Sequence, residues 1–237
     1  MNRDIPTLRS LLICTVIAVQ GACVAPSRDA LEEESGDSQR HLFSANTVIE
    51  DAWQQLSFLG TTQYRLEIYQ NRLAISARGR SSSSGLIRYV EIDTRHCPEM
   101  EWSWSVTVLQ PGADIRIRER EDVAASIFLL FGDPGFVFDP SPVPTLRYVW
   151  TNDRVAAESV IDSPYMPDTV RSLVVQSGTQ RGGQWITQKR DLRRDFRTAF
   201  GFPPPGPVRA VAIFTDNDQT GEEVEAYYEW ARLLCQH

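Results

Sequence analysis

The sequence has few of the residues that many enzymes use for metal binding and acid–base chemistry. It contains three histidines, His41, His96 and His237, and no two of them have metal-ligand spacing. No HExxH, CxxC or GxSxG motif occurs, and the serine-rich segment between Gly79 and Gly85 lacks the lysine of a phosphate-binding loop. Zinc-dependent, nucleophilic and nucleotide-dependent catalysis are therefore unsupported, whereas hydrolysis by two carboxylates that are distant in sequence stays open.

An excess of positive charge is also missing. The formal net charge is -7 at pH 7. The N-terminal signal described below carries one net positive charge, so its removal leaves the rest of the chain near about -8. Basic residues cluster in 116–120 and 189–197, but carboxylates interrupt both runs. The charge balance argues against a nucleic-acid partner, and both basic runs are typical of solvated surfaces.

No apolar run is long enough to cross a bilayer as a helix. The apolar run from Leu11 to Val19 follows basic residues and has the length of a signal-peptide core. The next residues, Gln20-Gly-Ala-Cys23, are similar to the lipobox of bacterial lipoproteins, with glutamine where leucine is usual. We predict a signal peptide over 1–22 and lipidation of Cys23, with an ordinary cleaved signal as the alternative. The expected location is exported, either periplasmic or anchored to a membrane only through this lipid.

Cysteine is scarce, which makes its positions informative. Of four cysteines, Cys14 lies in the signal and Cys23 would carry lipid, so Cys97 and Cys235 remain. In an oxidising compartment these two could form a disulfide that closes most of the domain. Two unpaired buried thiols are the alternative.

The rest of the chain divides into a tether and one domain. Residues 23–45 are polar and acidic, which predicts a flexible tether, and residues 46–237 have the size of a single domain. Short segments with alternating apolar residues follow one another between turn residues. This pattern predicts a mainly β fold, a β-sandwich or jelly roll with one or two short helices. Strands are expected at 64–68, 73–77, 100–108, 123–131, 146–150, 170–175, 208–214 and 223–234.

Some of these segments carry finer signals. Gln70-Asn71 is expected to turn the first hairpin, and 123–131 is apolar on both faces, as in a central strand. Helices are expected at Thr47–Phe58 and Asp191–Phe200, the latter ended by Gly201. The segment 223–234 fits either structure, and its aromatic content favours a strand.

The segment from Thr215 to Gly221 has the features of a cation-binding loop. It offers Asp216, Asp218 and Thr220 at alternate positions, which predicts a simple calcium site. An EF-hand is excluded because its twelfth position, counted from Asp216, is Tyr227. In the alternative interpretation these side chains only fix a turn by bonding to their own backbone.

Aromatic residues provide a second candidate site. A flat ring can stack on a sugar, and neighbouring polar groups can bond to its hydroxyls. The candidate ligand-binding residues are Asp122, Tyr148, Trp150 and Trp185. For each tryptophan, including Trp102 and Trp104, packing in the core between two sheets is the alternative.

Several short motifs occur together between Trp53 and the C-terminus. They are Ser83-Ser84-Gly85-Leu86, Trp102-Ser-Trp104, Glu121-Asp122, Tyr148-Val-Trp150, Asp195-Phe196, Phe200-Gly201 and Thr215-Asp-Asn-Asp-Gln-Thr-Gly221. In their order they resemble the bacterial domain of unknown function family numbered 3047. The chain departs from the family pattern at Glu121, where aspartate is usual, and at Gln219, where asparagine is usual. The resemblance implies a secreted β-sandwich-like domain without an assigned activity.

Together these features favour a noncatalytic exported envelope protein that binds a carbohydrate or another cell-wall polymer. A carboxylate-dependent carbohydrate-active enzyme and a purely structural lipoprotein are the alternatives. No catalytic residue is proposed from the sequence, and calcium is the one candidate cofactor.

Overall fold

The computed structural model describes residues 39–45, 53–132, 135–136, 139–140 and 142–236, which belong to one compact unit. The predicted signal peptide, Cys23 and the tether up to residue 38 lie outside the described residues, and they stay predictions. Within the described ranges, no helix is both long and apolar enough to cross a bilayer.

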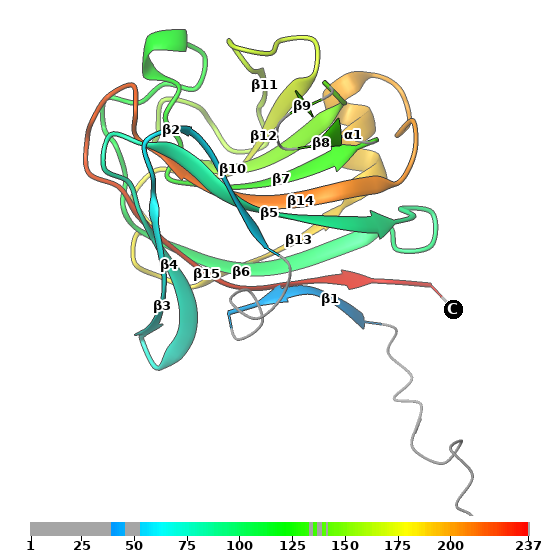
Figure 1. Cartoon of the computed structure of the whole chain (residues 1–237), viewed down its shortest axis with the longest axis horizontal. Coiled ribbons are helices and arrows are strands. Elements are labelled where there is room, and N and C mark those ends of the chain that lie inside the picture. Colours follow the sequence, from blue (N-terminus) through cyan, green and yellow to red (C-terminus); the bar gives the residue numbers. More distant parts are fainter. Residues whose placement is uncertain (1–38, 46–52, 133–134, 137–138, 141, 237) are drawn as a thin grey trace, which may run out of the picture. The chain divides into compact units, whose positions relative to one another are not determined.

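The described strands form two large sheets, as Figure 1 shows. Sheet A has the order β13-β6-β15-β4-β3 with β1 also beside β15: β1 (Gln39–Ser44), β3 (Gln63–Tyr69), β4 (Arg72–Arg78), β6 (Glu99–Val108), β13 (Ile186–Asp191) and β15 (Glu225–Leu234). Sheet B has the order β11-β12-β10-β7-β14-β5-β2: β2 (Gln54–Leu59), β5 (Ser83–Ile92), β7 (Ala125–Phe131), β10 (Thr145–Thr151), β11 (Val160–Asp162), β12 (Val170–Ser177) and β14 (Val208–Asp216). The other elements are the short strands β8 (Gly135–Phe136) and β9 (Asp139–Pro140), a 3₁₀ turn (Arg118–Arg120) and the helix α1 (Leu192–Phe200).

The core lies between the two sheets and is rich in aromatic rings. Trp102 of β6 stacks on Tyr148 of β10 with ring centroids 5.0 Å apart, and Trp104 lies 6.1 Å from Trp150. All four side chains are 0% exposed. Rings of this size remove much apolar surface from water, so this contact between the sheets contributes strongly to folding. The prediction of a mainly β sandwich with one or two short helices is confirmed.

The side chains of strand β6 alternate between the two faces of sheet A. Trp102, Trp104 and Val106 belong to the core, whereas Ser103 and Ser105 alternate with them on the opposite face. Successive side chains of a strand point to opposite faces of the sheet. The same alternation in β3, β4 and β15 gives sheet A a second face, turned away from the core.

Two local predictions are confirmed in detail. Gln70 and Asn71 join β3 to β4 with φ angles of 48° and 62°, the left-handed conformation that a two-residue hairpin turn requires. Helix α1 begins after Asp191, whose side chain accepts a 2.9 Å hydrogen bond from the Arg194 backbone N–H. It ends at Gly201, which has a φ of 80°. Strand β15 confirms the choice of a strand for the last segment.

Two sequence predictions are wrong where the structure describes the chain. The helix at Thr47–Phe58 lies partly outside the described residues, but Gln54–Leu59 is strand β2, which pairs with β5 at the edge of sheet B. The spacing of apolar residues in this short segment fits both a helix and a strand. Its structure is decided by backbone pairing with the edge of sheet B. The tether is wrong over 39–45, because β1 pairs with β15 and buries Leu42 and Phe43. The sequence prediction missed these two core residues because the predicted tether, 23–45, is polar and acidic as a whole.

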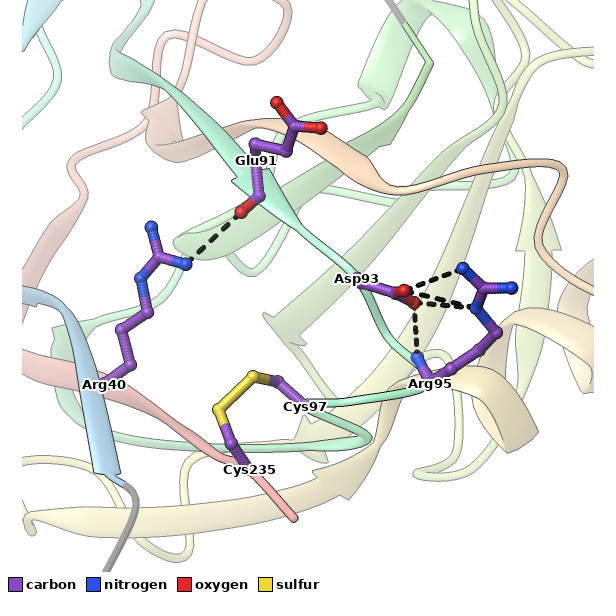
Figure 2. The surroundings of a disulfide bond; sticks show 6 residues. All are labelled: Arg40, Glu91, Asp93, Arg95, Cys97 and Cys235. Carbon is purple, nitrogen blue, oxygen red and sulfur yellow. Dashed lines mark hydrogen bonds and ion pairs between the residues drawn. A yellow bond between two sulfur atoms is a disulfide. The ribbon is translucent and has the colours of Figure 1, made fainter. Parts of the chain in front are cut away.

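A disulfide joins Cys97 to Cys235, the pairing that the sequence left open, and Figure 2 shows its surroundings. Cys97 ends a tight turn in which its backbone N–H donates to the Asp93 carbonyl at 2.8 Å. The guanidinium and backbone N–H of Arg95 bond to the Asp93 carboxylate and lower the pKa of Asp93 to about 2. The disulfide therefore ties the end of β15 to an ordered turn before β6.

Candidate functional site

Three of the four residues predicted to bind a ligand are buried. Asp122, Tyr148 and Trp150 are 0% exposed, so the prediction that they form a sugar-binding surface is wrong. The Tyr148 hydroxyl donates to Asp195 at 3.1 Å, and the Trp150 indole N–H donates to the Gly178 carbonyl at 3.3 Å. The aromatic alternation of β10 points into the sandwich, which is the alternative that the sequence left open. The fourth residue, Trp185, is only half-buried.

Trp185 belongs to an aromatic cluster on the side of sheet A that faces away from the core. We call this surface the sheet A face. Its rings are carried by β3, β15 and the residue before β13. Tyr69, Trp185 and Trp230 are half-buried, and Tyr227, which stacks on Tyr69, is buried. Its floor consists of small buried side chains, Ala74, Ser76, Ser103 and Ser105. Small residues let the larger rings lie close against the sheet.

The β3–β4 hairpin brings Tyr69 over this floor. Tyr69 stacks on Tyr227 with ring centroids 4.2 Å apart and lies 5.8 Å from Trp185. The Tyr69 hydroxyl and the Gln70 side-chain amide both donate to the Gly183 carbonyl, at 2.9 and 2.8 Å. In Figure 1 the hairpin, drawn in cyan, extends past β15 at the lower left. These contacts fix the rings before any ligand arrives, which lowers the entropic cost of binding.

Arginine side chains lie against two of the rings. The guanidinium of Arg72 lies 5.5 Å from the Trp185 ring centroid, and that of Arg232 lies 5.0 Å from Trp230. Each of these arginines also forms an ion pair with a glutamate of β15 or β6. Arg72 bonds to Glu229 at 3.0 Å, and Arg232 bonds to Glu101 at 2.7 Å.

Arg78 holds two glutamates of the sheet A face at once. It bonds to both carboxylate oxygens of Glu67, at 2.6 and 2.8 Å, and to Glu225 at 2.5 Å. These bonds lower the pKa of Glu67. Although burial acts in the opposite direction, hydrogen bonds from Thr107 and Arg78 also lower the pKa of Glu225. Both acids are therefore ionised at neutral pH.

A pocket of about 410 Å³ lies at one margin of the sheet A face, between the edge strands β2 and β3. Polar side chains of the two edges line it together with apolar side chains of the core. They are Trp53, Gln55, Thr61, Thr62, Gln63, Tyr64, Arg65, Leu66, Ile75 and Leu86. Gln63 and Arg65 alternate with the core-facing Tyr64 and Leu66, so these two residues connect the pocket with the sheet A face.

A group of three carboxylates lies at the C-terminal end of β14. Oxygens of Asp122, Asp216 and Asp218 lie within 4.8 Å of one another. The sequence predicted Asp216 and Asp218 here, together with Thr220, and missed Asp122. The Thr220 hydroxyl donates to Asp122 at 2.5 Å, and its backbone N–H donates to the same oxygen at 2.7 Å. Thr220 therefore orients a carboxylate, and its hydroxyl is engaged there.

The electrostatics of this carboxylate group suit a cation. Burial raises the pKa of Asp216 well above its usual range; Arg147 opposes this effect, and Glu121 and Asp122 add to it. Burial and the neighbouring Asp122 also raise the pKa of Asp218. One oxygen of Asp218, Oδ1, is buried without a hydrogen-bond partner. All these donors are oxygens, which is the ligand chemistry that calcium prefers, so the residues present fit that ion.

Most residues of the sheet A face were not predicted from the sequence. Tyr69 and Arg72 belong to one hairpin, but Tyr227 comes from a distant part of the chain, and only the strand order brings it beside them. The sequence did contain a usable signal, because core-facing and outward-facing side chains alternate along each strand. Once Tyr228 and Trp104 are assigned to the core, their neighbours Tyr227 and Ser105 must face the other way.

The chain belongs to the family described as Protein of unknown function (DUF3047), whose model matches residues 51–231. The search of curated proteins found no match.

The chain is also similar, at low sequence identity, to several solved structures. One is a family 11 carbohydrate-binding module of the cellulosomal cellulase Lic26A-Cel5E of Clostridium thermocellum, with 9% identity, a TM-score of 0.44 and coverage of 84% of this chain and 96% of that one. Another is a family 11 module from Clostridium thermocellum in complex with a β-1,3-1,4-mixed-linked tetrasaccharide, with 9% identity, a TM-score of 0.42 and coverage of 84% and 98%. A third is the Endo-D glycoside hydrolase domain from Streptococcus pneumoniae R6, with 7% identity and a TM-score of 0.39; the match covers 78% of this chain and 22% of that one.

Proposed function

We propose that this member of the DUF3047 family binds a carbohydrate polymer on its sheet A face without cleaving it. One observation carries the proposal: Trp185 and Tyr69 lie side by side and half-buried on the face away from the core, where stacking on the buried Tyr227 and a hydrogen bond to Gly183 hold Tyr69 in place. Aromatic rings supply large contact area at low entropic cost and stack on the apolar faces of sugars.

The polar groups around the rings complete a surface suited to hydroxyl-bearing ligands. The guanidinium of Arg72 lies over the Trp185 ring and is paired with Glu229; the Arg72 side chain is 46% exposed and that of Glu229 is 17% exposed. Each keeps hydrogen-bonding capacity beyond its ion pair, because a guanidinium has five N–H donors and a carboxylate about four acceptor sites. The pocket that begins at Arg65 provides a concave end to the same surface.

The ionised state of Glu67 and Glu225 supports a function that binds the polymer without cleaving it. A two-carboxylate glycosidase needs one protonated acid with a raised pKa. On the sheet A face, the pKa values of Glu67 and Glu225 are lowered instead. Neither acid is suited to donate a proton at neutral pH.

Affinity electrophoresis of the purified protein through gels that contain soluble polysaccharides tests this proposal. The panel should cover β-glucans, mannans, xylans and cell-wall glycans. We expect at least one polymer to retard migration without releasing reducing ends. Unaltered migration in every gel would contradict binding, and polymer-dependent release of reducing ends would favour the carboxylate enzyme.

We also propose that Asp122, Asp216 and Asp218 hold a calcium ion that stabilises the domain. The observation that favours this role is the buried Asp218 Oδ1 without a partner, within a group of three carboxylates. The ion would offset the charge of the group and tie the loop after β14 to the segment before β7. It has no catalytic part in the proposal.

Calcium at about 100 times its dissociation constant is expected to stabilise the protein by about 2.7 kcal/mol. Scanning calorimetry with calcium and with EDTA measures this shift, which amounts to roughly 5 to 10 °C. Asp216→Asn should abolish the response to calcium. It should also raise the stability of the calcium-free protein at pH 7, since a raised folded-state pKa makes stability fall as pH rises above the unfolded value. An equal calcium response in the wild type and in Asp216→Asn would exclude this site.

Export and the lipid anchor at Cys23 remain part of the proposal because the described residues do not include them. They rest on the apolar run and the lipobox-like segment of the sequence. In this proposal the lipid holds the chain at a membrane while the sheet A face binds a polymer of the cell envelope.

A further inference from the structure

The ionic groups of the sheet A face neutralise one another. Arg72 pairs with Glu229, Arg232 with Glu101, and Arg78 with both Glu67 and Glu225.

Arg65 is the one cation of β3, β4, β6 and β15 that forms no ion pair with a described residue, and its charge acts on the nearby Glu67. The two acids on Arg78 leave one negative charge in excess there, and Arg65 offsets it. The face therefore presents dipoles and hydrogen-bonding groups with no local excess of either charge.

This arrangement treats charged and uncharged ligands differently. The guanidinium that lies against the ring cluster, that of Arg72, is already bound to Glu229, so an anionic ligand seated on the rings would have to displace that carboxylate or accept repulsion from it. The protein as a whole carries a net charge of -7, which adds repulsion at long range. A hydroxyl group meets neither obstacle, because it can donate to a carboxylate and accept from a guanidinium of the same ion pair.

We infer, on the basis of the function proposed above, that the ligand of the sheet A face is an uncharged polysaccharide of neutral sugars rather than a polymer bearing uronate or phosphate groups. The paired side chains select for hydroxyl groups, and the rings select for exposed apolar sugar faces. Since no net charge attracts the ligand, salt has little influence on its affinity.

The test compares each neutral polymer with its own carboxymethylated derivative, so that the backbone stays constant and only charge changes. Affinity electrophoresis and titration use the purified protein at 50 and 500 mM NaCl. We expect binding to a neutral polymer with a Kd that changes less than about twofold between the two salt concentrations. Its carboxymethylated derivative should bind at least about tenfold more weakly.

A matched pair of variants separates local from long-range charge. Glu67→Gln leaves Arg78 paired with one acid instead of two. It should reduce the ratio of the Kd values for the carboxymethylated and the neutral polymer by about threefold or more. Glu119→Gln, in the exposed 3₁₀ turn, changes the net charge of the protein by the same amount. It should leave the ratio of the two Kd values unchanged.

The outcomes distinguish this inference from the function on which it rests. Tighter binding to the carboxymethylated polymer, weakened by salt and lost in Trp185→Ala, would overturn the inference and leave the proposed function intact. Equal effects of Glu67→Gln and Glu119→Gln would also overturn it. Failure to bind any polymer, charged or neutral, would overturn the proposed function itself.

Discussion

Replacing Trp185 with alanine is expected to weaken polysaccharide binding by at least about 30-fold, the effect of losing roughly 2 kcal/mol at a binding hot spot. Trp185 lies next to Tyr69 and under the guanidinium of Arg72, so its removal takes away one ring and the support for both neighbours. Isothermal titration with a polymer from the panel measures the change. Trp185→Phe keeps an aromatic face and should recover a substantial part of the affinity.

The matched control is Tyr89→Ala. Tyr89 is 40% exposed, like many surface aromatics, but it lies on β5 of sheet B. We expect its replacement to change the affinity less than twofold, about 0.4 kcal/mol. If Tyr89→Ala weakened binding and Trp185→Ala did not, the binding surface would lie on the other sheet. Melting temperatures of both variants show whether the fold is intact.

The second large effect concerns the disulfide. Replacing Cys97 and Cys235 together by alanine is expected to lower the free energy of unfolding by about 4 to 5 kcal/mol. The two cysteines are 138 residues apart in sequence, so the bond closes a long loop and removes much entropy from the unfolded chain. Urea unfolding measures the change, which corresponds to a fall in Tm of about 10 °C or more.

A reducing agent supplies the control for this prediction. It should destabilise the wild type by a similar amount and leave the double variant unchanged. Polysaccharide binding below the melting temperature should persist in the double variant, because the disulfide does not belong to the sheet A face. A loss of less than about 1 kcal/mol would show that the turn from Asp93 and the pairing of β15 hold these strands without it.

Much of the fold could be predicted because its signals are local. The alternation of Met100, Trp102 and Trp104 defines β6, and the Gln70-Asn71 turn defines the β3–β4 hairpin. Strands β1 and β2 were missed for a different reason. Each is a short edge segment whose structure depends on a partner far along the chain, β15 for the first and β5 for the second.

The candidate sites depended still more on long-range order. Asp216 and Asp218 could be found in one short loop, but Asp122 joins them only because β7 and β14 are neighbours in sheet B. The aromatic motifs that stood out in the sequence, at Trp102 and Trp150, belong to the core. Of the rings of the sheet A face, the sequence predicted Trp185 alone; the others lie in strands whose core-facing side chains gave the clearer signal.

The most direct test of the sheet A face as the binding surface is amide hydrogen exchange, measured with and without a polysaccharide that retards the protein in gels. Slower exchange is expected at the hairpin turn, 69–72, and at 183–186, where the ring cluster is held. Exchange in β5 and at 216–220 should stay the same. Protection confined to sheet B or to the carboxylate group, with 69–72 and 183–186 unchanged, would contradict the account.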